Sequence, residues 1–154
     1  QRAEVVGLLA AYGGTDLLCY RAASPAELVA RQAAGWDPLI DWAATALNAP
    51  LVTTQGVVHV AQDSTVLARL TARVDALSPF HLAGFHDLVA ITGSLVLALA
   101  VTKGRLTAPE AWTLSRIDET WQIEQWGADD EASTLEAARH AALLDASRFY
   151  ALCG

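Results

Sequence analysis

Residues 107–127, TAPEAWTLSRIDETWQIEQWG, contain both the start and the end signals of a helix. Thr107 and Glu110 form a capping box, in which a hydroxyl and a carboxylate each accept a hydrogen bond from a backbone amide at the helix start. Pro109 suits the first turn of a helix, and Gly127 suits its end. We therefore predict one helix that runs from Thr107 to Gly127.

Comparable helix signals recur along most of the chain. A capping residue followed by apolar residues three and four positions apart is typical of a helix start, and glycine or proline marks the end. We expect an interruption at Thr92-Gly93, because glycine disfavours a helix interior. In addition to 107–127, the predicted helices cover residues 1–12, 24–35, 37–48, 63–77, 78–104 and 129–150.

One short segment carries a strand pattern. β-Branched residues dominate 51–54 and 57–60, on either side of Gln55-Gly56, which predicts a short β-hairpin, with an extended connector as the alternative. Residues 15–21 fit either a turn of helix or an extended linker. We therefore predict an all-α fold: a compact bundle of six or seven helices with at most one short β-hairpin.

Composition narrows the class of protein. With 154 residues, 53% of them hydrophobic, and a mean hydropathy of +0.30, the chain suits one folded domain and not a disordered protein. Its net charge of −7 argues against nucleic-acid binding, which depends on neutralising phosphates. The longest strongly apolar stretch, Leu88–Val101, has 14 residues. A membrane span needs about 20, so we expect no membrane insertion. The only cysteines, Cys19 and Cys153, indicate no disulfide framework.

Few residues suggest catalysis or metal binding. There is no phosphate-binding glycine loop and no serine-nucleophile motif, and we expect no cofactor. His81 and His86 are five residues apart, which directs them to different sides of a helix, so we expect no metal site. Asp37 and Asp41 share a helix face, and with His86 they define an alternative function as a small helical enzyme. The simpler interpretation is that Asp37 caps a helix and Asp41 faces solvent.

The negative charge of the chain is concentrated in one region. Residues 118–136 hold seven acidic side chains and no basic one. The charge of this region is therefore −7, which equals the net charge of the whole chain. At its end, Asp129, Asp130 and Glu131 suit the start of a helix, whose amides favour negative charge. Glu119 and Glu124 lie within the predicted helix over 107–127 and need another explanation.

If residues 107–127 form one straight helix, their apolar side chains make two stripes on nearly opposite sides. Glu119 then lies within one stripe, and Glu124 lies beside the other. A carboxylate among apolar side chains is costly to desolvate unless a cation approaches it. The two stripes consist of Trp112, Ile123 and Trp126, and of Leu114, Ile117 and Trp121.

Two interpretations of these carboxylates remain open. The first is an internal ion pair with Arg116, Arg105 or Arg73. The second is a recognition surface, in which aromatic side chains supply contact area and acids select a basic partner. The predicted partner-binding residues are Glu119, Glu124, Trp126, Gln122, Trp112, Trp36 and Asp37.

Four segments resemble one known family, the F1-ATPase assembly chaperones that hold the α subunit (the Atp-twelve chaperones). The resemblance covers about residues 8–127 in consistent order, and the last helix matches only loosely. Its motifs are Tyr12-x-x-Thr15-Asp16-Leu17-Leu18-Cys19-Tyr20-Arg21, Gln32-x-x-x-Trp36-Asp37-Pro38-Leu39-Ile40-x-Trp42, Gly93–Ala100 and Ser115–Gly127.

The resemblance implies a function that composition does not show. Proteins of this family bind the isolated α subunit of F1-ATPase until it joins β, and they are not enzymes. They have an N-terminal β-rich domain followed by a helical domain, and residues 1–154 match only the helical part, so we expect a fragment. The family's important acidic residue carries over to Glu119, with Glu124 next.

The resemblance also implies a location, because the family occurs in mitochondria and in bacteria. The high alanine and low lysine content favours the bacterial cytoplasm, with the mitochondrial matrix as the alternative. Besides the enzyme that would use Asp37, Asp41 and His86, a generic helical interaction module remains a further alternative function.

Overall fold

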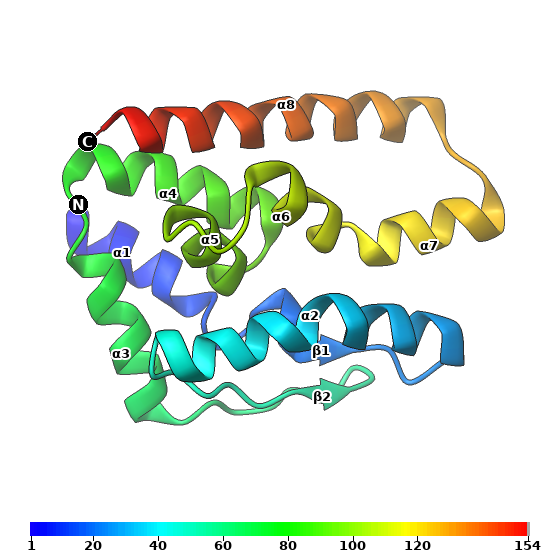
Figure 1. The fold of residues 1–154 in the computed structure, drawn as a ribbon, viewed down its shortest axis with the longest axis horizontal. Coiled ribbons are helices and arrows are strands. Elements are labelled where there is room, and N and C mark those ends of the chain that lie inside the picture. Colours follow the sequence, from blue (N-terminus) through cyan, green and yellow to red (C-terminus); the bar gives the residue numbers. More distant parts are fainter. Residues whose placement is uncertain (154) are drawn as a thin grey trace.

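A computed structural model of the chain describes residues 1–153. Within them, eight α-helices and one two-stranded sheet are present, and the strands lie in the two long connections, residues 12–25 and 47–63 (Figure 1). The predicted all-α bundle is confirmed, with eight helices in place of six or seven. The helices are α1 (Arg2–Ala11), α2 (Ala26–Ala46), α3 (Ser64–Asp75), α4 (Pro79–Thr92), α5 (Leu95–Thr102), α6 (Ala108–Ser115), α7 (Ile117–Trp126) and α8 (Asp130–Leu152), and the strands are β1 (Tyr20–Arg21) and β2 (Thr54–Gln55).

The core is built around α5, which is apolar on every side. Residues 95–100 are all buried, as expected for a helix without a polar face. Helices α2, α4, α6 and α8 pack around it, and α1 packs on α3 at the side of the molecule (Figure 1). Helix α7 lies apart from this core, at the end of the molecule opposite the N-terminus (Figure 1).

A buried carboxylate fixes the start of α5. Gly93 has a left-handed φ of 71° and ends α4, which confirms the predicted interruption there. Asp16 accepts hydrogen bonds from the Ser94 hydroxyl (2.7 Å), the Val96 amide (2.9 Å) and the Leu18 amide (3.0 Å). Burial raises the pKa of Asp16, and these hydrogen bonds oppose the rise. The segment before α2 is thereby attached to the central helix.

The prediction of separate helices over 24–35 and 37–48 is wrong, because α2 continues through Pro38. A proline costs a helix one amide hydrogen bond, and packing offsets that cost here. Asp37 caps no helix and instead forms an ion pair with Arg21 at 2.7 Å. The buried face of α2 continues past Pro38 without a break and consists of Leu28, Gln32, Trp36, Leu39 and Ala43.

The predicted β-hairpin over 51–60 is also wrong. Thr54 and Gln55 form β2, which pairs in parallel with β1, and the Gly56 amide donates to the Arg21 carbonyl at 2.9 Å. Val57 is fully exposed, so the second half of the expected hairpin has no apolar surface to cover. Pairing with a distant strand takes its place, and periodicity alone does not reveal such a partner.

The helix predicted over 107–127 is divided in two at Arg116. The capping box of Thr107 and Glu110 is confirmed at its start. Arg116 has a φ of −114° and a ψ of 18°, which separates α6 from α7. The two apolar stripes calculated for a straight helix are therefore wrong, since Trp112 lies on α6 and Trp126 on α7.

Candidate functional site

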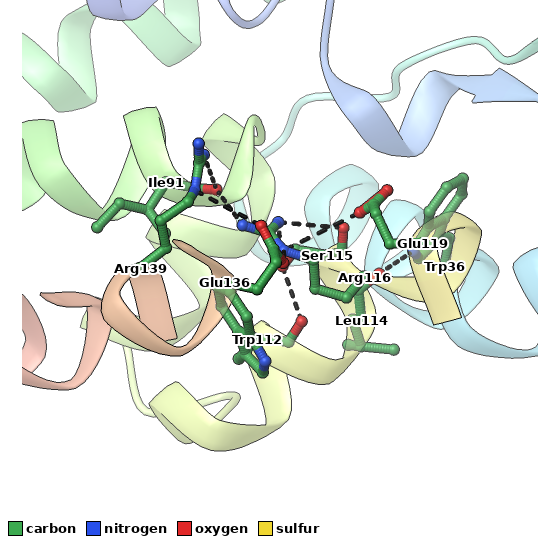
Figure 2. Close-up of polar contacts among 9 residues, drawn as sticks. All are labelled: Trp36, Ile91, Trp112, Leu114, Ser115, Arg116, Glu119, Glu136 and Arg139. Atoms are coloured by element: carbon green, nitrogen blue, oxygen red, sulfur yellow. Dashed lines mark hydrogen bonds and ion pairs between the residues drawn. The ribbon is translucent and has the colours of Figure 1, made fainter. Parts of the chain in front are cut away.

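A buried arginine joins four helices beneath the start of α7 (Figure 2). The Arg116 guanidinium donates to the Glu136 carboxylate on α8, to the Ile91 carbonyl on α4 (3.3 Å) and to the Ser115 hydroxyl on α6 (3.1 Å). It also lies over the Trp112 ring, 4.0 Å from its centroid. Arg116 thus fixes the direction in which α7 leaves the core.

Glu119 has only a weak internal partner. Its carboxylate lies 4.0 Å from Arg116, whose guanidinium is engaged more closely by Glu136, and half of its side chain is exposed (Figure 2). Partial burial raises the pKa of Glu119, Arg116 opposes the rise, and the nearby Asp118 and Glu136 charges add to it. The predicted ion pair with Arg116 is therefore present only at the limit of ion-pair distance.

Glu124 is fully paired within the chain. Both of its oxygens accept hydrogen bonds from Arg31 on α2, at 2.6 Å each, and this arginine lowers the pKa of Glu124. Arg31 also lies 5.0 Å from the centroid of the Trp121 ring, and Gln32 donates to Asp118 at 2.6 Å. These contacts hold α7 on α2. The internal partner of Glu124 is Arg31, which was not among the predicted arginines.

One face of α7 is open to solvent. Trp126 is 83% exposed and Ile123 is 50% exposed, and Gln122 is also exposed. Positions 119, 122, 123 and 126 have the spacing of residues that share a helix face. We call the face formed by Glu119, Gln122, Ile123 and Trp126 the α7 surface. It combines an aromatic side chain, an aliphatic one and a poorly paired carboxylate.

A groove adjoins the α7 surface on the side of α8. Its volume is about 430 Å³. Leu135 is 60% exposed and lines it opposite Ile123. The sequence did not predict this groove, because the groove forms only where the start of α8 returns alongside α7. Its only sign in the sequence is Leu135, an apolar residue in an acidic segment. The lining residues are Glu119, Ile123, Asp129, Ala132, Ser133, Leu135 and Glu136.

The other predicted partner-binding residues lie away from the α7 surface. Trp36 has no exposed surface, and its indole N–H donates to the Leu114 carbonyl at 2.8 Å (Figure 2). Trp112 is half-buried between Arg116 and His140, with the imidazole stacked parallel to it at 4.7 Å. Asp37 is exposed and paired with Arg21. Trp36 and Trp112 are therefore engaged in packing around α2 and α6, and Asp37 is engaged by Arg21.

The residues of the enzyme alternative are not brought together. Asp37 and Asp41 are exposed on α2, and His86 is exposed on α4 beside Asp87 (3.2 Å). No hydrogen bond or ion pair within residues 1–153 connects any two of the three.

Across the same residues, no cluster of His, Cys, Asp and Glu has the arrangement of a metal site. No helix in this part of the chain has the length and apolar character that crossing a bilayer requires.

Comparison with known proteins points to one family. A family model described as "ATP12 chaperone protein" matches residues 1–44. Atp12 from Paracoccus denitrificans has 56% sequence identity and a TM-score of 0.95, and the match covers 97% of this chain and 64% of that one. The Atu1473 protein from Agrobacterium tumefaciens has 38% identity and a TM-score of 0.89, over 97% of this chain and 56% of that one. The chain therefore spans less than two thirds of the length of these relatives.

Proposed function

Because this chain is related to the ATP12 chaperone proteins along 97% of its length, we propose that it is an assembly chaperone for the F1 sector of ATP synthase. In this proposal, residues 1–154 bind the free α subunit and hold it until it joins β. The role involves recognition and not catalysis. We propose that it takes place in the bacterial cytoplasm, or alternatively in the mitochondrial matrix.

The single observation that supports this role most is the exposure of the α7 surface. Contiguous apolar side chains left open to water on a folded domain are typical of interaction sites, whereas single exposed apolar residues are common on any surface. Trp126 offers an anchor of the kind that dominates binding energies at protein interfaces, and Ile123 adds apolar area beside it. Glu119, whose own cation is distant, supplies a charge that a basic residue of the α subunit can neutralise.

The size and chemistry of this surface suit a temporary complex. A chaperone must protect its client and then release it to the proper subunit. A modest patch with polar edges binds less permanently than the large apolar interfaces of obligate assemblies. In this proposal Glu119, Gln122 and Trp126 contact the α subunit directly. Glu124, Asp37, Trp36 and Trp112 contribute by holding α7 and its surroundings in place.

Reversing the charge of Glu119 tests the proposal. We expect Glu119→Lys to weaken capture of purified F1 α subunit by about tenfold or more, because a cation of the partner then meets a lysine. Glu119→Gln, which only removes the charge, is expected to have a smaller effect in the same direction. The measurement is a pull-down with the α subunit in titrated amounts.

Glu4→Lys on α1 is the matched control, since it makes the same change at an exposed position of another helix. It should leave capture unchanged. Equal capture by wild type, Glu4→Lys and a correctly folded Glu119→Lys variant would show that Glu119 makes no contact with the α subunit. Absence of capture by the wild type itself would overturn the proposed function.

A further inference from the structure

The groove between α7 and α8 has an apolar floor and an acidic rim. Ile123 and Leu135 line it from the two helices, and both remain at least half exposed. Its volume of about 430 Å³ lies within the range of pockets that enclose ligands, roughly 300–1,000 Å³. Apolar side chains left open in such a recess favour an apolar occupant.

The rim of the groove carries negative charge that the chain does not neutralise. Of the three carboxylates that line it, Glu136 is engaged by Arg116, whereas Glu119 approaches that arginine only to 4.0 Å. Asp129 uses one oxygen to cap α8 through the Ala132 amide. Within residues 1–153, Asp129 takes part in no ion pair, and the same is true of Asp130 and Glu131 in the first turn of α8. An occupant that carries positive charge is therefore favoured over a neutral or acidic one.

The wall formed by α7 is fixed before any partner arrives. The Arg31–Glu124 pair and the Gln32–Asp118 hydrogen bond attach it to α2, and Trp121 is buried beneath it. At its start, Arg116 links it to α8 through Glu136. A groove held in this way loses little conformational entropy when it is filled.

We propose that this groove anchors an amphipathic helix of the client, whose apolar side chains insert between Ile123 and Leu135 and whose Arg or Lys residues lie along the acidic rim. Helices with apolar residues on one face dock in this manner into grooves between two helices. The inference rests on the proposed function, because it specifies which part of the client the chaperone holds. It extends the contact beyond the exposed face of α7 to the first turns of α8.

Leu135→Asp tests the inference, with Leu8→Asp as the matched control. Both replacements add one negative charge at an exposed leucine, 60% exposed in the groove and 69% exposed on α1. The probes are purified F1 α subunit and a labelled synthetic helix with leucine on one face and arginine on both flanks. A second peptide with glutamate in place of each arginine controls for charge. Dissociation constants are measured by fluorescence polarisation for the peptides and by titrated capture for the α subunit.

We expect Leu135→Asp to weaken binding of the α subunit and of the arginine peptide by about tenfold or more, since a charge replaces an apolar anchor. Leu8→Asp should bind both like the wild type, and the glutamate peptide should not bind.

If Leu135→Asp and Leu8→Asp both bind the α subunit as tightly as the wild type does, the groove is not the anchor, although the proposed function stands. If the wild type binds the arginine peptide through Leu135 but does not bind the α subunit, the proposed function fails and the groove remains a site for basic helices. Equal peptide binding by both variants would show non-specific charge attraction and overturn the inference.

Discussion

Replacing Asp16 by alanine is expected to lower the free energy of unfolding by about 3–5 kcal/mol, because it leaves several buried donors without an acceptor. The Asp16 carboxylate accepts from the Ser94 hydroxyl and from the Leu18 and Val96 amides, and its side chain is buried. Each buried donor left unpaired costs about 1–3 kcal/mol. The segment before α2 would also lose its attachment to α5. Equilibrium unfolding in urea measures the change.

Two further variants serve as references for the change measured with Asp16→Ala. Asp16→Asn keeps the shape and one acceptor oxygen, so its loss should be smaller than that of Asp16→Ala. Ser78→Ala removes an exposed helix cap, whose hydroxyl accepts from the His81 amide and is also hydrogen-bonded to the His81 imidazole, both within α4, and it should cost about 1 kcal/mol. If Asp16→Ala costs no more than Ser78→Ala, then Asp16 does not hold α5 in place.

Trp126→Ala is expected to weaken binding of the F1 α subunit by about thirtyfold or more, which corresponds to roughly 2 kcal/mol. Tryptophan supplies a large contact area with few rotatable bonds, and Trp126 has 83% of its surface available. The stability of the free protein should hardly change, since this side chain makes few contacts of its own. Titration calorimetry with purified α subunit measures the affinity, and thermal unfolding measures the stability.

Phe80→Ala is the control for Trp126→Ala. Phe80 is 70% exposed on α4, so the replacement removes an aromatic ring of similar exposure from a different part of the molecule. We expect it to leave the affinity for the α subunit unchanged. Equal losses in both variants would indicate a general loss of apolar surface, and no loss in either would exclude Trp126 as an anchor.

The parts of the fold that could be predicted from sequence depend on local interactions. The capping box of Thr107 and Glu110 forms as predicted, because a cap needs only the amides two or three residues later. Asp63, Ser78 and Asp129 likewise cap the predicted helices that begin at these positions. The break at Gly93 was predicted for the same reason. Each of these features depends only on residues that lie within about one helical turn of one another in the sequence.

The parts that could not be predicted depend on distant residues. Pro38 remains inside α2 because the face around Trp36 is buried continuously, and β2 pairs with β1 instead of forming a hairpin. The division at Arg116 accompanies contacts of its guanidinium with Glu136 and Ile91 on other helices. Residue propensities and hydrophobic periodicity describe local sequence only, so they do not reveal these long-range contacts.

The same difference between local and distant interactions applies to the candidate site. Glu119 and Trp126 share a face of α7, and their spacing of seven residues was visible in the sequence. The partner of Glu124 is Arg31, which lies 93 residues earlier, so sequence spacing gave no sign of it. The groove beside α8 depends on how two consecutive helices fold back on each other, and its lining residues span both.

Hydrogen–deuterium exchange in the presence and absence of purified F1 α subunit tests whether the α7 surface and the groove beside it hold the α subunit. Helix α7 packs mainly on α2 and α6 at one end of the molecule, so its amides should exchange measurably in the free protein (Figure 1). We expect the α subunit to slow exchange over residues 117–135, which include the α7 surface and the start of α8. Slowed exchange confined to α1 and α3, with residues 117–135 unchanged, would contradict it.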